Sequence, residues 1–325
     1  VCLLRRGWPP SFLLMCDEAW TMAAHMERLV SETTGGNRSC FDYLVWYVDP
    51  SATPTAGDLT MRAGFSPHRD RQPDDVAASF RADGTPRYAT CWLPLTDACP
   101  ENSCLYMLPA HADPGYHDGD LPAPAPDPLQ RALHDKHAFQ QLRCLPAPRG
   151  SACVFTHRVI HWGSAGRPGY HTPRIAVSVA CADPLFERPY LLNTSQVFPS
   201  LSTRFALCCA QMIVYHERFH FTAKQLLFFR HCFERSHELF HPEYVSKVRQ
   251  EFVSAARETV DGDVQPSSSG TQKDRLVTKE QQPQEGKKLS DKEEDDDIEE
   301  DQDKAGDEDE EDDEDEEDDE DEEDD

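Results

Sequence analysis

The stretch GFSPHRDRQPDD at residues 64–75 places one histidine, two arginines and three acidic residues close together. Within it, one residue separates His68 from Asp70, and residues i and i+2 of an extended strand point to the same side. An imidazole and a carboxylate aimed at one point are two of the three ligands of the facial triad that holds Fe(II) and leaves coordination positions open. A second triplet, His111 to Asp113, offers the same groups, so the spacing alone does not identify the site.

A third ligand must come from a distant strand, and residues 155–180 read FTHRVIHWGSAGRPGYHTPRIAVSVA. His161 is the candidate third ligand. Arg174 begins the next predicted strand, with Ser178 on the same face. A guanidinium binds a carboxylate in a bidentate manner and stays charged when buried, so it suits the far carboxylate of 2-oxoglutarate, a co-substrate that chelates iron through its keto-acid end. We therefore predict Fe(II), 2-oxoglutarate and O2 as cofactor and co-substrates, with Arg167 in the turn as the alternative carboxylate partner.

Short apolar segments separated by Gly, Pro and Asp predict strands at 42–49, 86–95, 104–108, 151–157 and 174–180. This pattern indicates an antiparallel sandwich or barrel rather than βαβ units. Trp92 and Thr90 would line the 2-oxoglutarate pocket if their face of the strand points inward; ordinary core packing is the alternative. Apolar residues at helical spacing predict a helix at 16–34 and two or three amphipathic helices after residue 203, packed on the outside of the sheet.

The charge of the chain is concentrated at its end. Of the 35 residues at 291–325, 29 are Asp or Glu and two are Lys, so this run carries 27 of the 28 net negative charges. Such a block cannot bury enough apolar surface to offset its chain entropy. We predict a folded domain at 1–260, a linker at 261–290 and a disordered acidic tail at 291–325. The tail is either solubilising or a contact for a basic protein partner, and it disfavours direct nucleic-acid binding because it repels phosphates.

The twelve cysteines include no CxxC pair, and several lie in apolar segments. They indicate reduced core residues of an intracellular protein, with the cytoplasm or the nucleus as its location. No apolar run is long enough to span a bilayer, so we expect no membrane span.

The sequence resembles the phytanoyl-CoA dioxygenase family of Fe(II)/2-oxoglutarate oxygenases over roughly residues 40–200. The resemblance lies in the order PHRD, then YATCWLPLTDACPENSCLYMLP, then HWGS and PRIAVSVA. It implies a mainly β fold with flanking helices and a double-stranded β-helix core of the jelly-roll or cupin-like kind. It also implies iron ligands at His68, Asp70 and His161 and a 2-oxoglutarate arginine at Arg174, and it places His111 at a non-ligand position.

The expected activity is hydroxylation of a C–H bond of a small-molecule or lipid-like substrate that the sequence does not specify. One alternative is a non-catalytic β-helix module whose acidic tail binds basic proteins, and another is a protein hydroxylase. Arg69 and Arg71 flank the site; they are either exposed loop charges or contacts for an anionic substrate. We expect the remaining histidines, among them His157, to be structural or on the surface.

Overall fold

A computed structural model of the chain describes residues 2–52, 64–122, 124–219 and 221–262. The predicted acidic tail and all but the first two residues of the predicted linker lie outside these ranges. Among the described residues, no helix combines the length and the apolar composition needed to cross a bilayer.

The larger of two antiparallel sheets runs in the order β1-β7-β2-β5. Its strands are β1 (Arg38–Val48), β7 (Arg174–Ala182), β2 (Tyr88–Pro94) and β5 (Cys153–Thr156). β7 pairs with β1 on one side and with β2 on the other, which puts it in the middle of the sheet. All four correspond to segments that the alternation of apolar residues predicts.

The smaller sheet runs in the order β4-β3-β6 and consists of β4 (Arg143–Leu145), β3 (Leu105–Met107) and β6 (His161–Gly163). An apolar core with residues from both sheets fills the space between them, including Trp46 of β1, Trp92 of β2 and Leu105 of β3. The strand predicted at 104–108 corresponds to β3, whereas β4 and β6, which are equally short, were not predicted.

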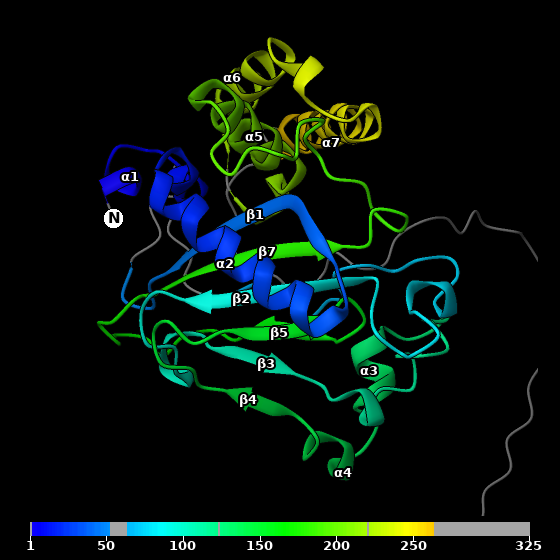
Figure 1. The fold of residues 1–325 in the computed structure, drawn as a ribbon. Helices are drawn as coiled ribbons and strands as arrows, with labels where there is room; N and C mark the ends of the chain where they lie inside the picture. Colours follow the sequence, from blue (N-terminus) through cyan, green and yellow to red (C-terminus); the bar gives the residue numbers. More distant parts are fainter. Residues whose placement is uncertain (1, 53–63, 123, 220, 263–325) are drawn as a thin grey trace, which may run out of the picture. The chain divides into compact units, whose positions relative to one another are not determined.

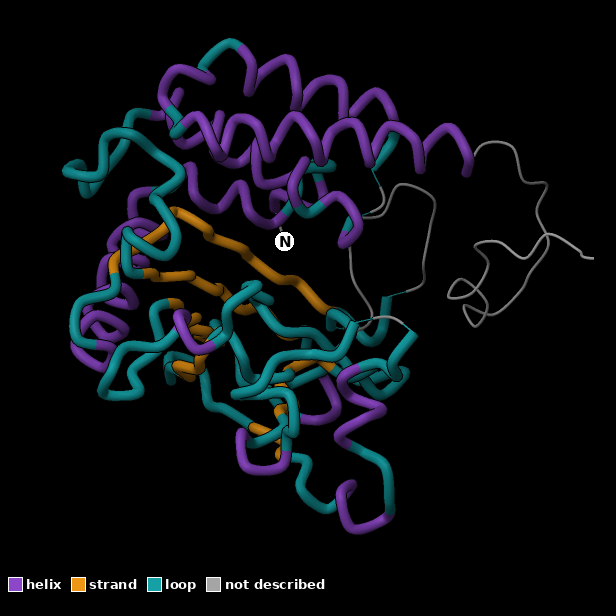
Figure 2. Tube along the Cα trace, turned by 90° about the vertical axis from the view of Figure 1, so that its right-hand side faces the viewer, coloured by secondary structure: helices purple, strands orange, loops and turns teal. Residues whose placement is uncertain are grey.

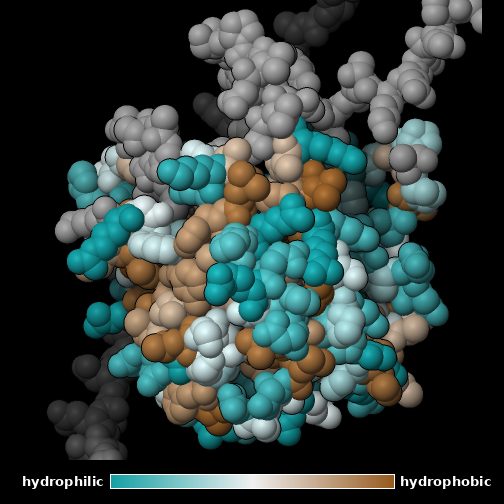
Figure 3. All heavy atoms as spheres, turned by 90° about the horizontal axis from the view of Figure 1, so that it is seen from above, coloured by the Kyte–Doolittle hydropathy of each residue, from teal (hydrophilic) through white to brown (hydrophobic). Residues whose placement is uncertain are grey.

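Helices cover the outer face of the larger sheet (Figures 1 and 2). The longer ones are α2 (Asp17–Thr34), α5 (Leu201–Val214), α6 (Ala223–Glu234) and α7 (Pro242–Gly262). The short ones are α1 (Cys2–Arg5) and two helices that lie beside the smaller sheet instead (Figure 1), α3 (Pro128–Ala132) and α4 (Lys136–Phe139). α5 is buried along most of its length between the sheet and its neighbouring helices, whereas α6 and α7 are amphipathic. On the face of the molecule that these helices cover, hydrophobic side chains lie among hydrophilic ones (Figure 3).

A bulge in β1 determines which of its residues face the interior. The pairing with β7 shifts register between Ser39 and Asp42, and Phe41 has a positive φ of 63°. Beyond the bulge, Asp42, Leu44 and Trp46 face the space between the sheets. The alternate residues, such as Tyr43, join the core under the helices. The antiparallel sheets with flanking helices confirm that part of the predicted fold class, although the helices contain more residues than the strands. The assignment to the double-stranded β-helix stays a prediction.

Candidate metal centre

His68 and His161 are brought together by one antiparallel β-bridge, although they are 93 positions apart. The backbone N–H of His68 donates to the carbonyl of His161 at 3.1 Å, and that of His161 donates back at 3.0 Å. Residues that exchange both hydrogen bonds lie directly opposite each other with side chains on the same face. Asp70 is two residues further along, and its N–H donates to the carbonyl of His157 at 3.1 Å. His68 is thus in no named strand, yet the extended geometry that the prediction required is present.

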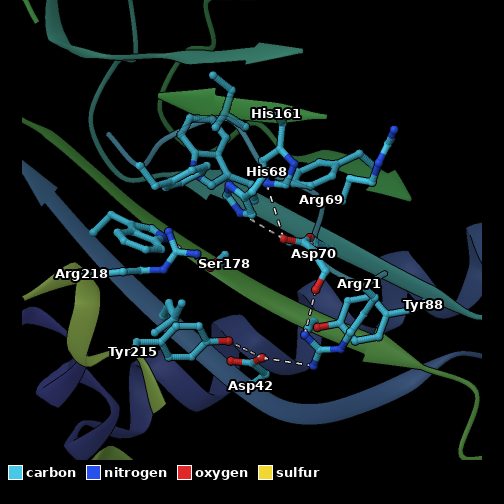
Figure 4. A pocket seen from close by; sticks show the side chains of 18 residues that line it. Asp42, His68, Arg69, Asp70, Arg71, Tyr88, His161, Ser178, Tyr215 and Arg218 are labelled. Atoms are coloured by element: carbon cyan, nitrogen blue, oxygen red, sulfur yellow. Dashed lines mark hydrogen bonds and ion pairs between the residues drawn. The ribbon is translucent and has the colours of Figure 1, made fainter. Parts of the chain in front are cut away.

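The three predicted ligands converge on one point (Figure 4). Asp70 Oδ1 lies 3.6 Å from His68 Nε2 and 3.5 Å from His161 Nε2. One ligand atom from each residue lies within 4.8 Å of the other two. His161 is buried, and the other two side chains are partly exposed. Two imidazoles and one carboxylate in this arrangement suit a divalent metal with open coordination positions.

Hydrogen bonds from outside the triad orient each ligand. The Nδ1–H of His68 donates to the carbonyl of Ser66 at 2.8 Å, and that of His161 donates to the carbonyl of Val159 at 3.0 Å. Because a carbonyl can only accept, both rings carry the proton on Nδ1 and present Nε2 as the metal-binding atom. The Thr90 hydroxyl donates to Asp70 Oδ2 at 2.5 Å, which leaves Oδ1 for the metal.

The electrostatics of the three ligands favour the forms that bind a metal. Burial raises the pKa of Asp70, but the nearby His161 and His68 and the Thr90 hydrogen bond outweigh this effect and hold it well below its usual range. Burial lowers the pKa of His161. Metal ligation requires an ionised carboxylate and a neutral imidazole, and both shifts act in that direction.

The Arg174 guanidinium lies in the interior without a hydrogen-bond partner among the described residues. It is fully buried, and none of its three guanidinium nitrogens is hydrogen-bonded to any part of the chain that the structure describes. The same holds for the indole N–H of Trp92, whose ring centre lies 5.8 Å from the guanidinium carbon. Burial lowers the pKa of Arg174 to about 10. Several buried donors without an acceptor form a site that fits an incoming carboxylate.

Glycine at position 163 allows a close approach of the Gly64 backbone next to this guanidinium. A Cβ on residue 163 would lie 2.7 Å from the Gly64 Cα and 3.5 Å from Arg174 Nη2. Gly163 is two residues from His161 on β6, so the two positions share a face. The same face of β6 therefore carries the metal ligand His161 and, two residues later, Gly163 beside Arg174.

A cavity of about 130 Å³ adjoins the three metal ligands. Thr90, Trp92 and Ser178 all line it, as their predicted role in the co-substrate pocket requires. Their roles stay predictions. The Ser178 hydroxyl accepts a hydrogen bond from the Trp46 indole at 3.3 Å. Arg174 does not line this cavity; it lies behind the wall to which Trp92 belongs.

The expectation that Arg69 and Arg71 are exposed loop charges is wrong. The side chain of Arg69 is 1% exposed and forms ion pairs with Asp113 and Asp120. Arg71 pairs with Glu187 through Nε and Nη2 and lies over the Tyr88 ring at 4.6 Å. Both arginines are held by acidic residues from distant parts of the chain, which local composition cannot indicate.

The competing triplet does not form a metal site. His111 is exposed, whereas Asp113 is buried and paired with Arg69. His157 is structural, as expected, because its two ring nitrogens bond to the Tyr88 carbonyl and the Ser79 hydroxyl. Arg167, the alternative carboxylate partner, is exposed in its turn, 5.4 Å from the Tyr170 ring centre.

Sequence reasoning missed several residues that line the cavity, among them Asp42, Tyr215 and Arg218. Asp42 accepts hydrogen bonds from the hydroxyls of Tyr215 at 2.7 Å and Tyr190 at 3.1 Å. Arg218 faces the cavity from beyond α5. Asp42, Leu44 and Trp46 are spaced two residues apart on β1 and face the same side, so the two-residue alternation of the strand would have revealed Asp42. No local signal marks Tyr215 or Arg218.

No protein-family model matches the chain, and no curated protein matches its sequence. Similar solved structures include AviO1 from Streptomyces viridochromogenes Tue57, at 20% identity and a TM-score of 0.33, covering 49% of this chain and 57% of that one. The non-heme alpha ketoglutarate dependent epimerase SnoN from nogalamycin biosynthesis is 22% identical with a TM-score of 0.33 and coverages of 52% and 57%. The non-heme alpha ketoglutarate dependent carbocyclase SnoK from nogalamycin biosynthesis is 16% identical with a TM-score of 0.36, and the match covers 50% of this chain and 57% of SnoK.

SnoN and SnoK are, by description, of the enzyme class that the sequence resemblance implies, and SnoN has been solved with Fe3+ and alpha ketoglutarate. The chain spans little more than half the length of the structures named here. Because these TM-scores lie below 0.5, function must be argued from the residues of the site itself.

Proposed function

We propose that the chain is an Fe(II)- and 2-oxoglutarate-dependent oxygenase that hydroxylates a C–H bond of a small-molecule or lipid-like substrate. The observation that carries the proposal is the convergence of His68 Nε2, His161 Nε2 and Asp70 Oδ1 at a cavity, each held by a further hydrogen bond. Three protein ligands on one side of a metal leave the other positions open for co-substrate and O2.

The residues around the triad have distinct roles in this proposal. Iron with bound 2-oxoglutarate supplies O2 activation coupled to oxidative decarboxylation of the co-substrate to succinate and CO2. Arg174 holds the far carboxylate of 2-oxoglutarate, with the Trp92 indole as a second donor; their lack of hydrogen-bond partners among the described residues supports this. Thr90 fixes Asp70, and the aromatic lining that includes Phe65 and Phe155 excludes water from the reacting centre.

Metal binding and turnover test the proposal directly. Purified protein titrated anaerobically with Fe(II), or with Co(II) as a spectroscopic probe, should bind one equivalent. With Fe(II), O2 and 2-oxoglutarate it should then release succinate slowly without a prime substrate. His68→Ala and Asp70→Ala should each abolish both readouts, whereas His111→Ala, which changes an exposed histidine of the competing triplet, should leave both intact. Undiminished metal binding in the Asp70→Ala protein would refute the assignment.

The two alternatives depend on the acidic tail, which lies outside the described residues, and both stay predictions. A non-catalytic module would show no stoichiometric iron and no succinate release. A protein hydroxylase would show both and would be stimulated by basic peptides rather than by small molecules. A combined metabolite and peptide screen for stimulated succinate release separates these outcomes.

A further inference from the structure

Three arginines line the cavity beside the metal centre, namely Arg69, Arg71 and Arg218. The first two are held by carboxylates of the chain, as described above. The side chain of Arg218 forms no hydrogen bond and no ion pair with any residue in the described ranges, and only its backbone N–H donates, to the carbonyl of Tyr215 at 3.0 Å. It therefore differs from the other two in having its hydrogen-bonding fork free.

Aromatic rings hold Arg218 in place. It belongs to the short 3-10 helix η5 (His216–Arg218), which follows α5. Its guanidinium carbon lies 5.5 Å from the ring centres of Trp46 and Phe65 and 5.7 Å from that of Tyr215. Figure 4 shows the side chain directed toward Ser178, with Arg71 on the opposite side of the pocket. Ring faces attract a cation but do not satisfy its five N–H donors.

The surroundings of Arg218 indicate what would complete its hydrogen bonding. A half-buried guanidinium fork is matched by a carboxylate, which it binds in a bidentate, charge-assisted manner. The wall next to it is apolar, formed by Leu44, Trp46 and Phe65. Asp42, the nearby acid, is already occupied as an acceptor by Tyr215, Tyr190 and Gln211. An anion with an apolar body fits this combination of contacts.

We infer that Arg218 binds the carboxylate of the prime substrate, which is therefore a small organic acid with an apolar body. The inference rests on the proposed oxygenase function, in which Arg174 takes the carboxylate of 2-oxoglutarate. Arg174 and Arg218 then bind different anions, because Arg218 lines the cavity and Arg174 does not. The rings of Trp46, Phe65 and Tyr215 hold the Arg218 guanidinium in place before the substrate arrives, which reduces the entropy lost on binding.

A binding experiment with redox-silent Mn(II) tests the inference without turnover. The full-length protein is loaded with Mn(II) and saturating 2-oxoglutarate and titrated with hexanoate, and with hexanamide as the neutral analogue, by calorimetry. Hexanoate should bind more tightly than hexanamide. Arg218→Gln should weaken hexanoate binding about 10-fold or more and abolish the preference for the acid, and Arg218→Lys should restore part of it. The affinity for 2-oxoglutarate should be unchanged in both variants.

Arg230→Gln is the matched control, because Arg230 also lies over a ring, that of Phe252 at 4.5 Å, but does not line the cavity. Equal binding of hexanoate and hexanamide to the wild type, or loss of 2-oxoglutarate rather than hexanoate in Arg218→Gln, would overturn the inference. Repeating the hexanoate titration on metal-free protein tests the anion site at Arg218 separately from the oxygenase function. If Mn(II) does not bind but hexanoate still binds through Arg218, the oxygenase proposal fails and the anion site stands.

Discussion

Replacing Arg174 with methionine should stabilise the metal-free protein while abolishing its binding of 2-oxoglutarate. The guanidinium is fully buried without a hydrogen-bond partner among the described residues. Burial lowers its pKa from 12.5 to about 10, and each pKa unit corresponds to about 1.4 kcal/mol. Because the folded state disfavours the charged form of this base, the free energy of unfolding is reduced by about 3 kcal/mol at every pH below 10.

Methionine fills part of the same volume and needs no acceptor. After a loss of about 1 kcal/mol from imperfect packing, the net gain is about 1–2 kcal/mol, which corresponds to a rise of about 2–8 °C in the melting temperature. Calorimetric unfolding of chelator-treated protein measures this change. Adding Mn(II) and 2-oxoglutarate should then raise the melting temperature of the wild type and not that of Arg174→Met.

Arg158→Met is the control for burial alone. Arg158 is also fully buried, but its guanidinium donates to the carbonyls of Gly115 at 2.7 Å and Tyr116 at 3.4 Å. Its replacement leaves these two carbonyls without a donor and should destabilise the protein by about 1–3 kcal/mol for each of them. A metal-free Arg174→Met protein that melts below the wild type, or one that still binds 2-oxoglutarate, would refute the reasoning.

Three further changes test the elements that support the site. Thr90→Val removes the donor to Asp70 Oδ2 and should weaken Co(II) binding about 10-fold, whereas Thr21→Val on the exposed face of α2 should not; equal affinities would exclude a positioning role. Gly163→Ala places a methyl 2.7 Å from the Gly64 Cα. It should lower the free energy of unfolding by about 1–3 kcal/mol and also lower the metal affinity. An unchanged melting temperature would contradict the close contact. The pKa of Asp183 is lowered by a backbone N–H and two arginines, so its contribution to stability is present above its ordinary pKa of 3.8 and lost as the pH falls. Asp183→Asn should therefore be less stable than the wild type at pH 7, with the difference vanishing in urea titrations at acidic pH; a pH-independent difference would point to lost packing instead.

Local sequence patterns indicated much of the scaffold. The two-residue alternation located the four strands of the larger sheet, and the three- and four-residue spacing located α2 and the C-terminal helices. These patterns are readable because each element must expose one face and bury the other within a few residues. The strands β4 and β6 escaped detection because three residues do not establish a period and neither lies in an apolar segment such as CLYML, which contains β3.

The sequence by itself determined which residue types are available for the site and how they are spaced. It offered an imidazole and a carboxylate two positions apart, a later histidine as the third ligand and a later arginine for the co-substrate. Tertiary structure decided which of them meet. It set His68 opposite His161 through a single bridge, paired Arg69 with Asp113, and left Arg174 and Arg218 without acidic partners in the described chain. The physical reason is that side-chain direction follows from neighbouring residues, whereas the partner of a buried charge is chosen by packing between segments that are far apart in the sequence, such as Arg69 and Asp113 at a separation of 44 residues.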